Sequence, residues 1–398
     1  MNILVLNCGS SSVKYQFIEA ESQKTLARGS IERIGMDGAT LTNMRYDGDE
    51  IKIVGEIVDH ISAIEYILAV LLSRNHGVIN EKSDIHAIGH RVVHGGETFT
   101  ASVLINDEVI KGIRNNFEIA PLHNPHNLRG INACQVSLPG TPQVAVFDTA
   151  FHQQMPRRSF LYGIPYSLYT QYRIRRYGFH GMSHRYVSER TTALLKKDVS
   201  ALKMVTCHLG NGCSMAAIDH GTSVDTTMGF TPLEGLLMGT RSGDIDPSVI
   251  LYIMAKEGIN IAEANTLLNK HSGLQGISGV GSDMREVLKE MHNGDKKAGY
   301  AFEIFCYRIR KYIGAYAAAM GGLDAVVFTG GIGENSPDVR LESCKDLNFL
   351  GISIDEKANS SSEKEKFISP PGSKVAVLVV PTNEELVIAL DTMRIVKG

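Results

Sequence analysis

Several patterns that would place the chain in a large class of proteins are missing from its 398 residues. No apolar run approaches the roughly 18 residues that a bilayer span needs, so we expect no membrane segment. The formal net charge of −3 gives no electrostatic basis for binding nucleic acid or an anionic membrane surface. The six cysteines form no CxxC pair and are too sparse for a disulfide scaffold, which is typical of a reducing compartment. The first residues carry neither the basic nor the apolar region of a signal peptide, so we expect a cytoplasmic protein.

Common nucleotide and zinc motifs are missing as well. The glycine turn at residues 329–335 matches neither G-x-x-x-x-G-K-[ST] nor G-x-G-x-x-G, so it is neither a Walker A loop nor a Rossmann fingerprint. His180 and His184 lie four residues apart, but no glutamate accompanies them as in H-E-x-x-H, so we expect no zinc. His180, which lies among glycines, suits hydrogen bonding to an anion, or else it caps the following helix.

What the chain does contain is a glycine-rich hairpin that occurs twice. Residues 2–6 and 13–18 read as strands joined by a turn of glycine and serine, and residues 204–218 repeat the pattern around the turn at 210–214. Such turns let backbone and hydroxyl groups approach phosphate oxygens, although either turn alone could merely connect its strands. A length of 398 residues with 43% hydrophobic residues favours two globular domains. The repeat therefore predicts a duplicated fold that holds a nucleotide between its halves.

Two charged residues follow predicted strands in the first half. A strand at residues 84–89 delivers Arg91 among histidines and glycines, which indicates an anion site or else a surface arginine beside a turn. A buried strand at residues 143–147 ends in Asp148. A carboxylate there could hold a metal or orient a cation, or it could be a helix N-cap, which is the commoner use.

Two more candidates lie in the second half. Arg241 belongs to a glycine-rich, acid-bearing loop at residues 238–247, so it is a second anion-binding candidate or one half of a structural ion pair. Thr382 and Glu385 form the pattern of a capping box at the start of the last helix. That role would leave Glu384 available to a metal, the alternative being a solvated side chain.

Seven short strings, in their order and spacing, resemble the acetate kinase family over essentially the whole chain. Met182 and Cys213 depart from the residues expected in that family. The resemblance implies an α/β protein with the duplicated actin-like ATPase (ribonuclease H-like) fold, two domains and an active-site cleft between them. The N-terminal domain would be residues 1–150, completed by a C-terminal helix at about 385–398, and residues 151–384 would bind nucleotide and form the interface of a homodimer. The strings are residues 7–12, 90–96, 147–152, 178–181, 230–235, 239–244 and 381–385.

The resemblance also implies a reaction, which is the reversible transfer of a phosphoryl group from MgATP to acetate to give acetyl phosphate and ADP. Mg²⁺, with Mn²⁺ as a substitute, would be the cofactor. A kinase for propionate or another short-chain acid is the alternative on the same scaffold. An actin-like or chaperone-like ATPase is a third interpretation. The pair Arg91 and Arg241 argues against it, because a small anionic substrate needs paired cations.

The family pattern assigns roles to individual positions. The implied catalytic residues are Arg91, Asp148, His180 and Arg241. The acetate carboxylate would bind Arg91, and its methyl group a pocket formed by Val93, Leu122, Phe179 and Pro232. The metal would be held by Asn7 and Glu384. ATP would bind Ser10, Ser12, Lys14, His208, Leu209, Gly210, Asn211, Gly212, Asp283, Met284, Arg285, Gly331, Ile332, Gly333, Glu334 and Asn335.

Two of these assignments lead to hypotheses of our own. Acetate is already ionised at neutral pH, by analogy with a glutamate side chain of pKa about 4.3, so a general base would have no proton to remove. We therefore expect Asp148 to orient an arginine or a metal-bound water. A valine at position 93 should keep the acyl pocket short and favour acetate over propionate by a modest margin, because one methylene is worth about 1–3 kcal/mol.

Overall fold

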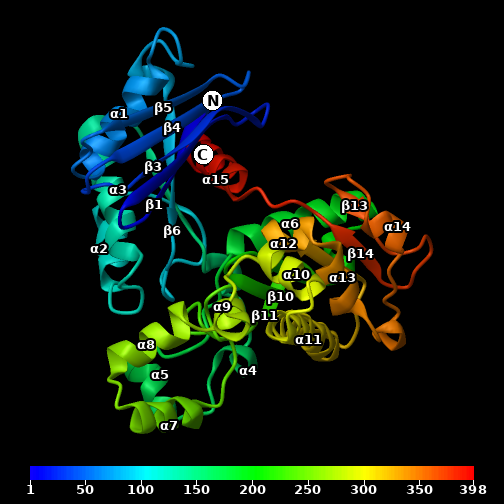
Figure 1. Cartoon of the computed structure of the whole chain (residues 1–398). Coiled ribbons are helices and arrows are strands. Elements are labelled where there is room, and N and C mark those ends of the chain that lie inside the picture. Colours follow the sequence, from blue (N-terminus) through cyan, green and yellow to red (C-terminus); the bar gives the residue numbers. More distant parts are fainter. The chain divides into compact units, whose positions relative to one another are not determined.

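The structure is a computed structural model that describes residues 1–398, and the chain forms two compact units. One unit consists of residues 1–151 together with 383–398, and the other consists of residues 152–382 (Figure 1). Residue 384 therefore belongs to the same unit as the N-terminal hairpin. Each unit is described by itself.

The N-terminal unit is built on an eight-stranded sheet of order β5-β4-β3-β2-β1-β6-β8-β7. Its strands are β1 (Asn2–Cys8), β2 (Ser12–Glu19), β3 (Lys24–Glu32), β4 (Ala39–Arg45), β5 (Glu50–Gly55), β6 (Ala87–Val92), β7 (Val103–Leu104) and β8 (Gln143–Phe147). Its helices are α1 (His60–Leu71), α2 (Asp107–Asn115), α3 (Asn124–Ser137) and α15 (Glu384–Lys397).

The C-terminal unit is built on a six-stranded sheet of order β11-β10-β9-β12-β14-β13. Its strands are β9 (Lys203–Leu209), β10 (Cys213–Asp219), β11 (Thr222–Thr226), β12 (Ala325–Thr329), β13 (Lys366–Phe367) and β14 (Ala376–Val379). Its helices are α4 (Arg157–Phe160), α5 (Tyr166–Tyr172), α6 (Gly181–Leu195), α7 (Pro247–Glu257), α8 (Ile261–Lys270), α9 (Gly273–Ser278), α10 (Met284–His292), α11 (Lys296–Met320), α12 (Gly330–Asn335), α13 (Pro337–Cys344) and α14 (Glu356–Asn359).

The two sheets share one five-stranded pattern. In the first, β1 pairs antiparallel with β2 and parallel with β6, β2 pairs antiparallel with β3, and β6 pairs parallel with β8. In the second, β9, β10, β11, β12 and β14 repeat these pairings in the same order and directions. The predicted α/β fold with two equivalent halves is confirmed, and both predicted hairpins lie at equivalent places in it.

Most local predictions hold near the site, with two corrections. Asp59 caps α1 by accepting from the backbone N–H of Ser62, and the helix packs its apolar side onto the core beneath β1–β4. The strand expected at residues 84–89 instead begins at Ala87, because residues 82–84 form a short 3₁₀ turn. Arg91 therefore lies within β6 and not in the loop that follows.

The start of α15 is the second correction. The cap is Asn383, whose side chain accepts from the backbone N–H of Leu386, so the predicted capping box of Thr382 and Glu385 is wrong. The backbone N–H of Thr382 donates to Glu334 Oε1, which holds Thr382 one residue before the capping position. The helix then packs closely on β6, since a Cβ at Gly89 would stand 2.5 Å from Ile388 Cγ2.

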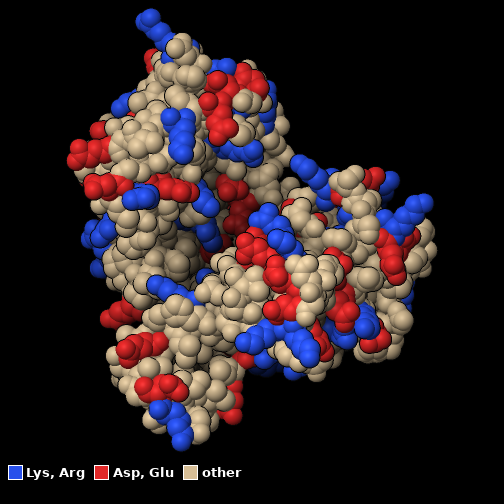
Figure 2. Space-filling model, in the orientation of Figure 1, with Lys and Arg blue, Asp and Glu red and all other residues tan.

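The surface carries both signs of charge. Lysine and arginine are interspersed with aspartate and glutamate over the face in Figure 2, in keeping with the small net charge. None of the helices combines the length and the apolar character that a bilayer span requires.

Candidate active site

In the N-terminal unit the first hairpin turn projects from the sheet beside two polar side chains. Asn7 and Lys14 are register partners on β1 and β2, so their side chains share one face of the sheet. The turn is closed by a hydrogen bond from Gly9 N to Ser12 O of 2.8 Å, and His60 Nε2 lies 2.8 Å from Gly9 O. Ser10 at the tip of the turn is exposed.

Arg91 and the buried Asp148 form an ion pair at the carboxyl ends of β6 and β8. Because these strands are parallel neighbours, their ends meet at one edge of the sheet, and Arg91 Nη2 donates to Asp148 Oδ2 at 2.5 Å. The Asp148 side chain is only 1% exposed. Burial alone would lower the pKa of Arg91, but the charges of Asp148 and Glu384 outweigh it and the net shift is upward. Arg91 Nε and Asp148 Oδ1 are buried and have no hydrogen-bond partner.

Two asparagines of α3 hold the loops around this pair, and no sequence pattern singles them out. Asn127 Nδ2 donates to Cys8 O at 2.9 Å, and its Oδ1 accepts from Val93 N at 3.0 Å. Asn124 bonds both the N–H and the carbonyl of His94. The ends of β1 and β6 are thereby tied to one helix, which fixes the backbone beside Asn7 and Arg91.

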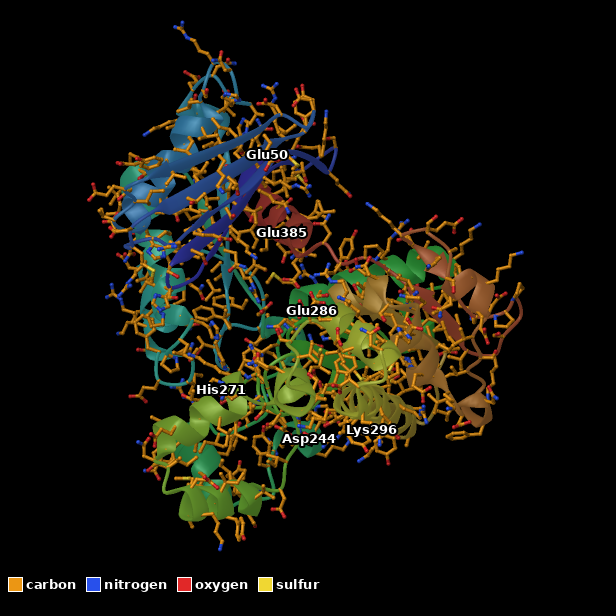
Figure 3. All side chains as sticks on the ribbon, viewed as in Figure 1. Glu50, Asp244, His271, Glu286, Lys296 and Glu385 are labelled. Atoms are coloured by element: carbon orange, nitrogen blue, oxygen red, sulfur yellow. The ribbon has the colours of Figure 1, made fainter.

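A cavity of about 330 Å³ connects these residues to the start of α15. Asn7, Lys14, Arg91 and Glu384 all line it. Glu50 and Glu385, which are labelled in Figure 3, line it from β5 and α15. The cavity is thus lined by charges of both signs, with three cations (Lys14, Arg28 and Arg91) and three carboxylates.

Glu384 carries the most perturbed carboxylate of this group. Burial raises its pKa to about 7; the charge of Arg91 opposes this, while Asp148 and Glu385 add to it. A divalent cation in the cavity would relieve the repulsion among these carboxylates. No group of three or more His, Cys, Asp and Glu side chains could hold a metal. An amide and one carboxylate with phosphate oxygens and water suit Mg²⁺, which usually binds few protein ligands, so the residues fit that ion.

In the C-terminal unit the second hairpin turn meets a histidine and an arginine. A Cβ at Gly212 would lie 3.5 Å from Arg241 Nη1 and 3.8 Å from His180 Nε2, so both donor groups approach the same turn. His180 occupies the N-cap position of α6 in a left-handed conformation with φ of 54° and makes no side-chain capping bond. His180 therefore caps the helix through its backbone carbonyl, which accepts from His184 N, and not through its imidazole.

Arg241 has no carboxylate partner. Its Nη1 donates to Pro232 O at 3.0 Å and lies 3.8 Å from the sulfur of Met238. Burial lowers the pKa of Arg241, and no acidic side chain offsets this. The structural ion pair considered from the sequence does not form, so the cation remains available to an anionic ligand.

A second cavity of about 520 Å³ lies wholly within the C-terminal unit and gathers three separate glycine-bearing stretches. Its volume is in the range of small-molecule sites. Asp283 caps α10 and pairs with Arg285 at 2.5 Å at its rim. Of the residues with an expected nucleotide role, the cavity is lined by Gly210, Asn211, Asp283, Met284, Arg285, Gly331, Ile332 and Asn335.

The other expected nucleotide residues of this unit lie beside the cavity and do not line it. Leu209 is fully buried in the core. The ring of His208 stacks on that of His180 at a centroid distance of 4.2 Å. The Glu334 carboxylate accepts from Gly330 N and Thr382 N, so it holds the turn together. Gly333 packs against the end of β9.

The four residues expected to contact the acyl group lie in different surroundings. Val93 and Phe179 are buried, with 7% and 4% exposure. Leu122 is 73% exposed in the N-terminal unit. Pro232 accepts the hydrogen bond of Arg241 through its carbonyl.

Comparison with known proteins shows the family of the chain. A sequence model of the acetokinase family matches residues 2–390. The chain is 55% identical over 398 residues to an acetate kinase of Symbiobacterium thermophilum, with all of both chains covered. Its structure resembles those of an acetate kinase from Porphyromonas gingivalis (48% identity, TM-score 0.97) and a propionate kinase from Francisella tularensis (44%, TM-score 0.92), each over 99% of both chains. The chain belongs to the acetokinase family.

Proposed function

We propose that the protein catalyses the reversible transfer of the γ-phosphoryl group of ATP to acetate, which gives acetyl phosphate and ADP. The observation that carries this proposal is the meeting of His180 Nε2 and Arg241 Nη1 at the Gly212 turn, with no carboxylate paired to the arginine. Phosphoryl transfer needs positioning and charge stabilisation more than covalent chemistry. A hydrogen-bond donor and an uncompensated cation at one glycine turn supply both.

Arg91 binds the acetate carboxylate in this proposal, and Asp148 orients Arg91. A carboxylate of ordinary pKa, about 4.3 for the glutamate analogue, arrives already ionised. The acetate oxygen attacks the γ-phosphorus while the bond to the β-phosphate oxygen breaks, and no proton has to move. The ion pair of 2.5 Å between Arg91 and Asp148 supports an orienting role.

The metal is Mg²⁺, with Mn²⁺ as a substitute, and Asn7 and Glu384 hold it. An ion held by these two residues would supply positive charge to the phosphate oxygens. Lys14, whose side chain shares a sheet face with Asn7, and the hydroxyl groups of Ser10 and Ser12 bind phosphate. The cavity of about 520 Å³ in the C-terminal unit binds the nucleoside of ATP.

The protein forms a homodimer through its C-terminal unit, in our proposal. Helix α7 has the sequence PSVILYIMAKE, yet none of its residues is buried. Leu251 and Tyr252 on it are 65% and 64% exposed. An apolar helix with no fully buried residue is typical of an interface between subunits. All six cysteines are free and buried, which fits a cytoplasmic location.

The direct test is to incubate the purified protein with MgATP and acetate and to trap acyl phosphate with hydroxylamine. We expect a hydroxamate product that needs both substrates. ATP hydrolysis indifferent to acetate would contradict the proposal. Propionate is assayed in parallel, because the propionate kinase of Francisella tularensis is 44% identical to the chain. A kcat/KM higher for propionate than for acetate would make the propionate reading the correct one.

A further inference from the structure

A chain of hydrogen bonds runs from β9 through α6 and β10 to the catalytic histidine. Thr206 Oγ1 lies 2.7 Å from His184 Nδ1, and His184 Nε2 lies 2.7 Å from Ser214 Oγ. Ser214 Oγ also lies 2.9 Å from His180 Nδ1. Thr206, His184 and Ser214 are fully buried, so the chain is shielded from water. None of the three was assigned a role from the sequence.

The protons of this chain are fixed by counting donors. Each hydroxyl has one hydrogen to donate, and a neutral imidazole donates from one nitrogen and accepts at the other. Burial, and then the neighbouring His152 and His208, lowers the pKa of His184 well below its usual value, so His184 is neutral. Two directions are then conceivable, one with protons donated towards His180 and the other with protons donated away from it.

Only one direction satisfies every buried donor. The Thr206 hydroxyl has no hydrogen-bond partner other than His184 Nδ1. If His184 donated to Thr206, the hydrogen of that buried hydroxyl would have no acceptor, at a cost of about 1–3 kcal/mol. Thr206 therefore donates to His184 Nδ1, His184 Nε2–H donates to Ser214, and Ser214 donates to His180 Nδ1.

We propose that Thr206, His184 and Ser214 act as positioning residues that hold His180 as an uncharged imidazole with its proton on Nε2. Since Nδ1 accepts the Ser214 hydrogen bond, the ring proton belongs on Nε2, the atom that faces the Gly212 turn. The inference rests on the proposed phosphoryl transfer. It makes His180 a neutral hydrogen-bond donor to the transferring group, and neither a cation nor a general acid.

The same chain resists a second proton on His180. With a proton on Nδ1 as well, the hydrogen of one buried hydroxyl group, either that of Ser214 or that of Thr206, would have no acceptor. Within its own unit His180 is surrounded by His208 on β9, His184 on α6, Ser214 on β10 and Arg241 on its loop. Burial raises the pKa of the nearby Cys213 to about 12, so that thiol is neutral as well.

The experiment uses the full chain labelled with ¹⁵N-histidine, with the His180 signal assigned by its loss in His180→Asn. Between about pH 5.5 and pH 8, where an ordinary histidine titrates, we expect His180 to remain the neutral Nε2–H form. In Ser214→Ala we expect a mixture of tautomers and a second proton at the acid end of this range. A wild-type His180 that is protonated on Nδ1, or charged at neutral pH, would overturn the proposal even where the variant fails to fold.

Kinetics give an independent readout. Ser214→Ala should lower kcat about tenfold and leave both KM values within about twofold, because the donor acts on the transition state more than on the bound substrates. The variant should also gain a pH-dependent limb that wild type lacks. Ser214→Thr, which keeps the hydroxyl, should restore the tautomer and most of kcat. An unchanged pH profile in a folded Ser214→Ala would reject the role. Failure of wild type to make acyl phosphate would reject the proposed function, while the NMR result would still test the tautomer.

Discussion

Arg91 Nη2 donates to Asp148 Oδ2 across 2.5 Å, and this pair joins the ends of two parallel strands of the N-terminal sheet. The second carboxylate oxygen of Asp148 is buried and has no hydrogen-bond partner. Arg91 Nε is also buried and has no hydrogen-bond partner. The pair therefore has unused hydrogen-bonding capacity on both sides. A guanidinium fixed in this way by one carboxylate is preoriented for a second, which is what an acetate ion presents.

The first prediction concerns Asp148→Asn. Without the carboxylate Arg91 loses the partner that orients it, and since a small misplacement of a binding group can cost about a hundredfold in rate, we expect kcat/KM for acetate to fall by about that factor. Much of the loss should appear in KM for acetate, because Arg91 loses its orientation. Steady-state kinetics measure both constants, and Asp37→Asn, at an exposed position, is the control. A large loss confined to kcat, with unchanged Mg²⁺ dependence and an unmoved Arg91 in a crystal structure, would instead support a proton-transfer role.

The second prediction separates two adjacent glutamates in one cavity. Glu384→Gln should raise the Mg²⁺ concentration needed for half-maximal rate by about tenfold or more, since even residues that only orient a metal ligand are worth 10–100-fold. Glu385→Gln is the matched control, because it lines the same cavity from the next position of α15. The initial rate of each variant, measured as a function of Mg²⁺ concentration, tests this prediction. Equal shifts in the two variants would mean that the effect is general electrostatics and not coordination.

The third prediction follows from the raised pKa of Glu384. The carboxyl has an ordinary pKa of 4.5 and a pKa of about 7 in the folded protein, so the folded state binds a proton that the unfolded chain has released. Stability must then fall as pH rises through this interval, on account of this group. Glutamine cannot ionise. In metal-free buffer the Tm of Glu384→Gln minus that of wild type should therefore increase from pH 4.5 to about 7 and then stay constant.

Thermal unfolding monitored by circular dichroism, with a chelator present, makes this measurement. Glu385→Gln again serves as the comparison, since it lines the same cavity from the next position of α15. A Tm difference that stays constant across the interval would show that Glu384 is not held in a destabilising environment.

How much of this could be read from the sequence depends on whether the signal was local. The strands and both hairpins were predictable because alternating apolar residues and glycine turns are short-range patterns. The grouping of Gly210, Asp283 and Gly331 around the cavity of about 520 Å³ was predictable too, since these residues lie in glycine-rich stretches. The clustering of such turns follows from parallel strands that end at one edge.

Contacts between distant side chains were not predictable. Asn127 bonds the carbonyl of Cys8 across 119 positions, and Ser214 bridges two histidines 30 and 34 positions away. An asparagine in a helix or a serine in a strand carries no local sign of such partners. The cap of α15 was predicted wrongly for a related reason. Thr382 and Asn383 are both acceptable caps, and the choice depends on the bond from Thr382 N to Glu334.

The fourth prediction concerns the length of the acid. Val93 is buried next to Arg91, and its backbone is held by Asn127. Val93→Ala should make room for a methylene and raise kcat/KM for propionate relative to acetate, mostly through KM, within the about 1–3 kcal/mol that one methylene is worth. The ratio is measured with both acids under identical conditions, and Val136→Ala, at an exposed position of α3, is the control. If the ratio does not move, Val93 does not border the acyl group.

The last prediction concerns the uncovered face of α7. Leu251→Glu places a charge on a helix that has seven aliphatic or aromatic residues and no buried one. If this helix lies in a homodimer interface, burying an unpaired carboxylate there is costly, and the variant should sediment as a monomer where wild type sediments as a dimer. Phe349→Glu, at a position 77% exposed in the same unit, should leave the dimer intact. Because Leu251 is 65% exposed within one chain, the fold of the monomer should be unaffected, and its circular dichroism should match that of wild type. A wild type that is itself monomeric at micromolar concentration, or a Leu251→Glu variant that remains dimeric, would show that α7 does not form a dimer interface.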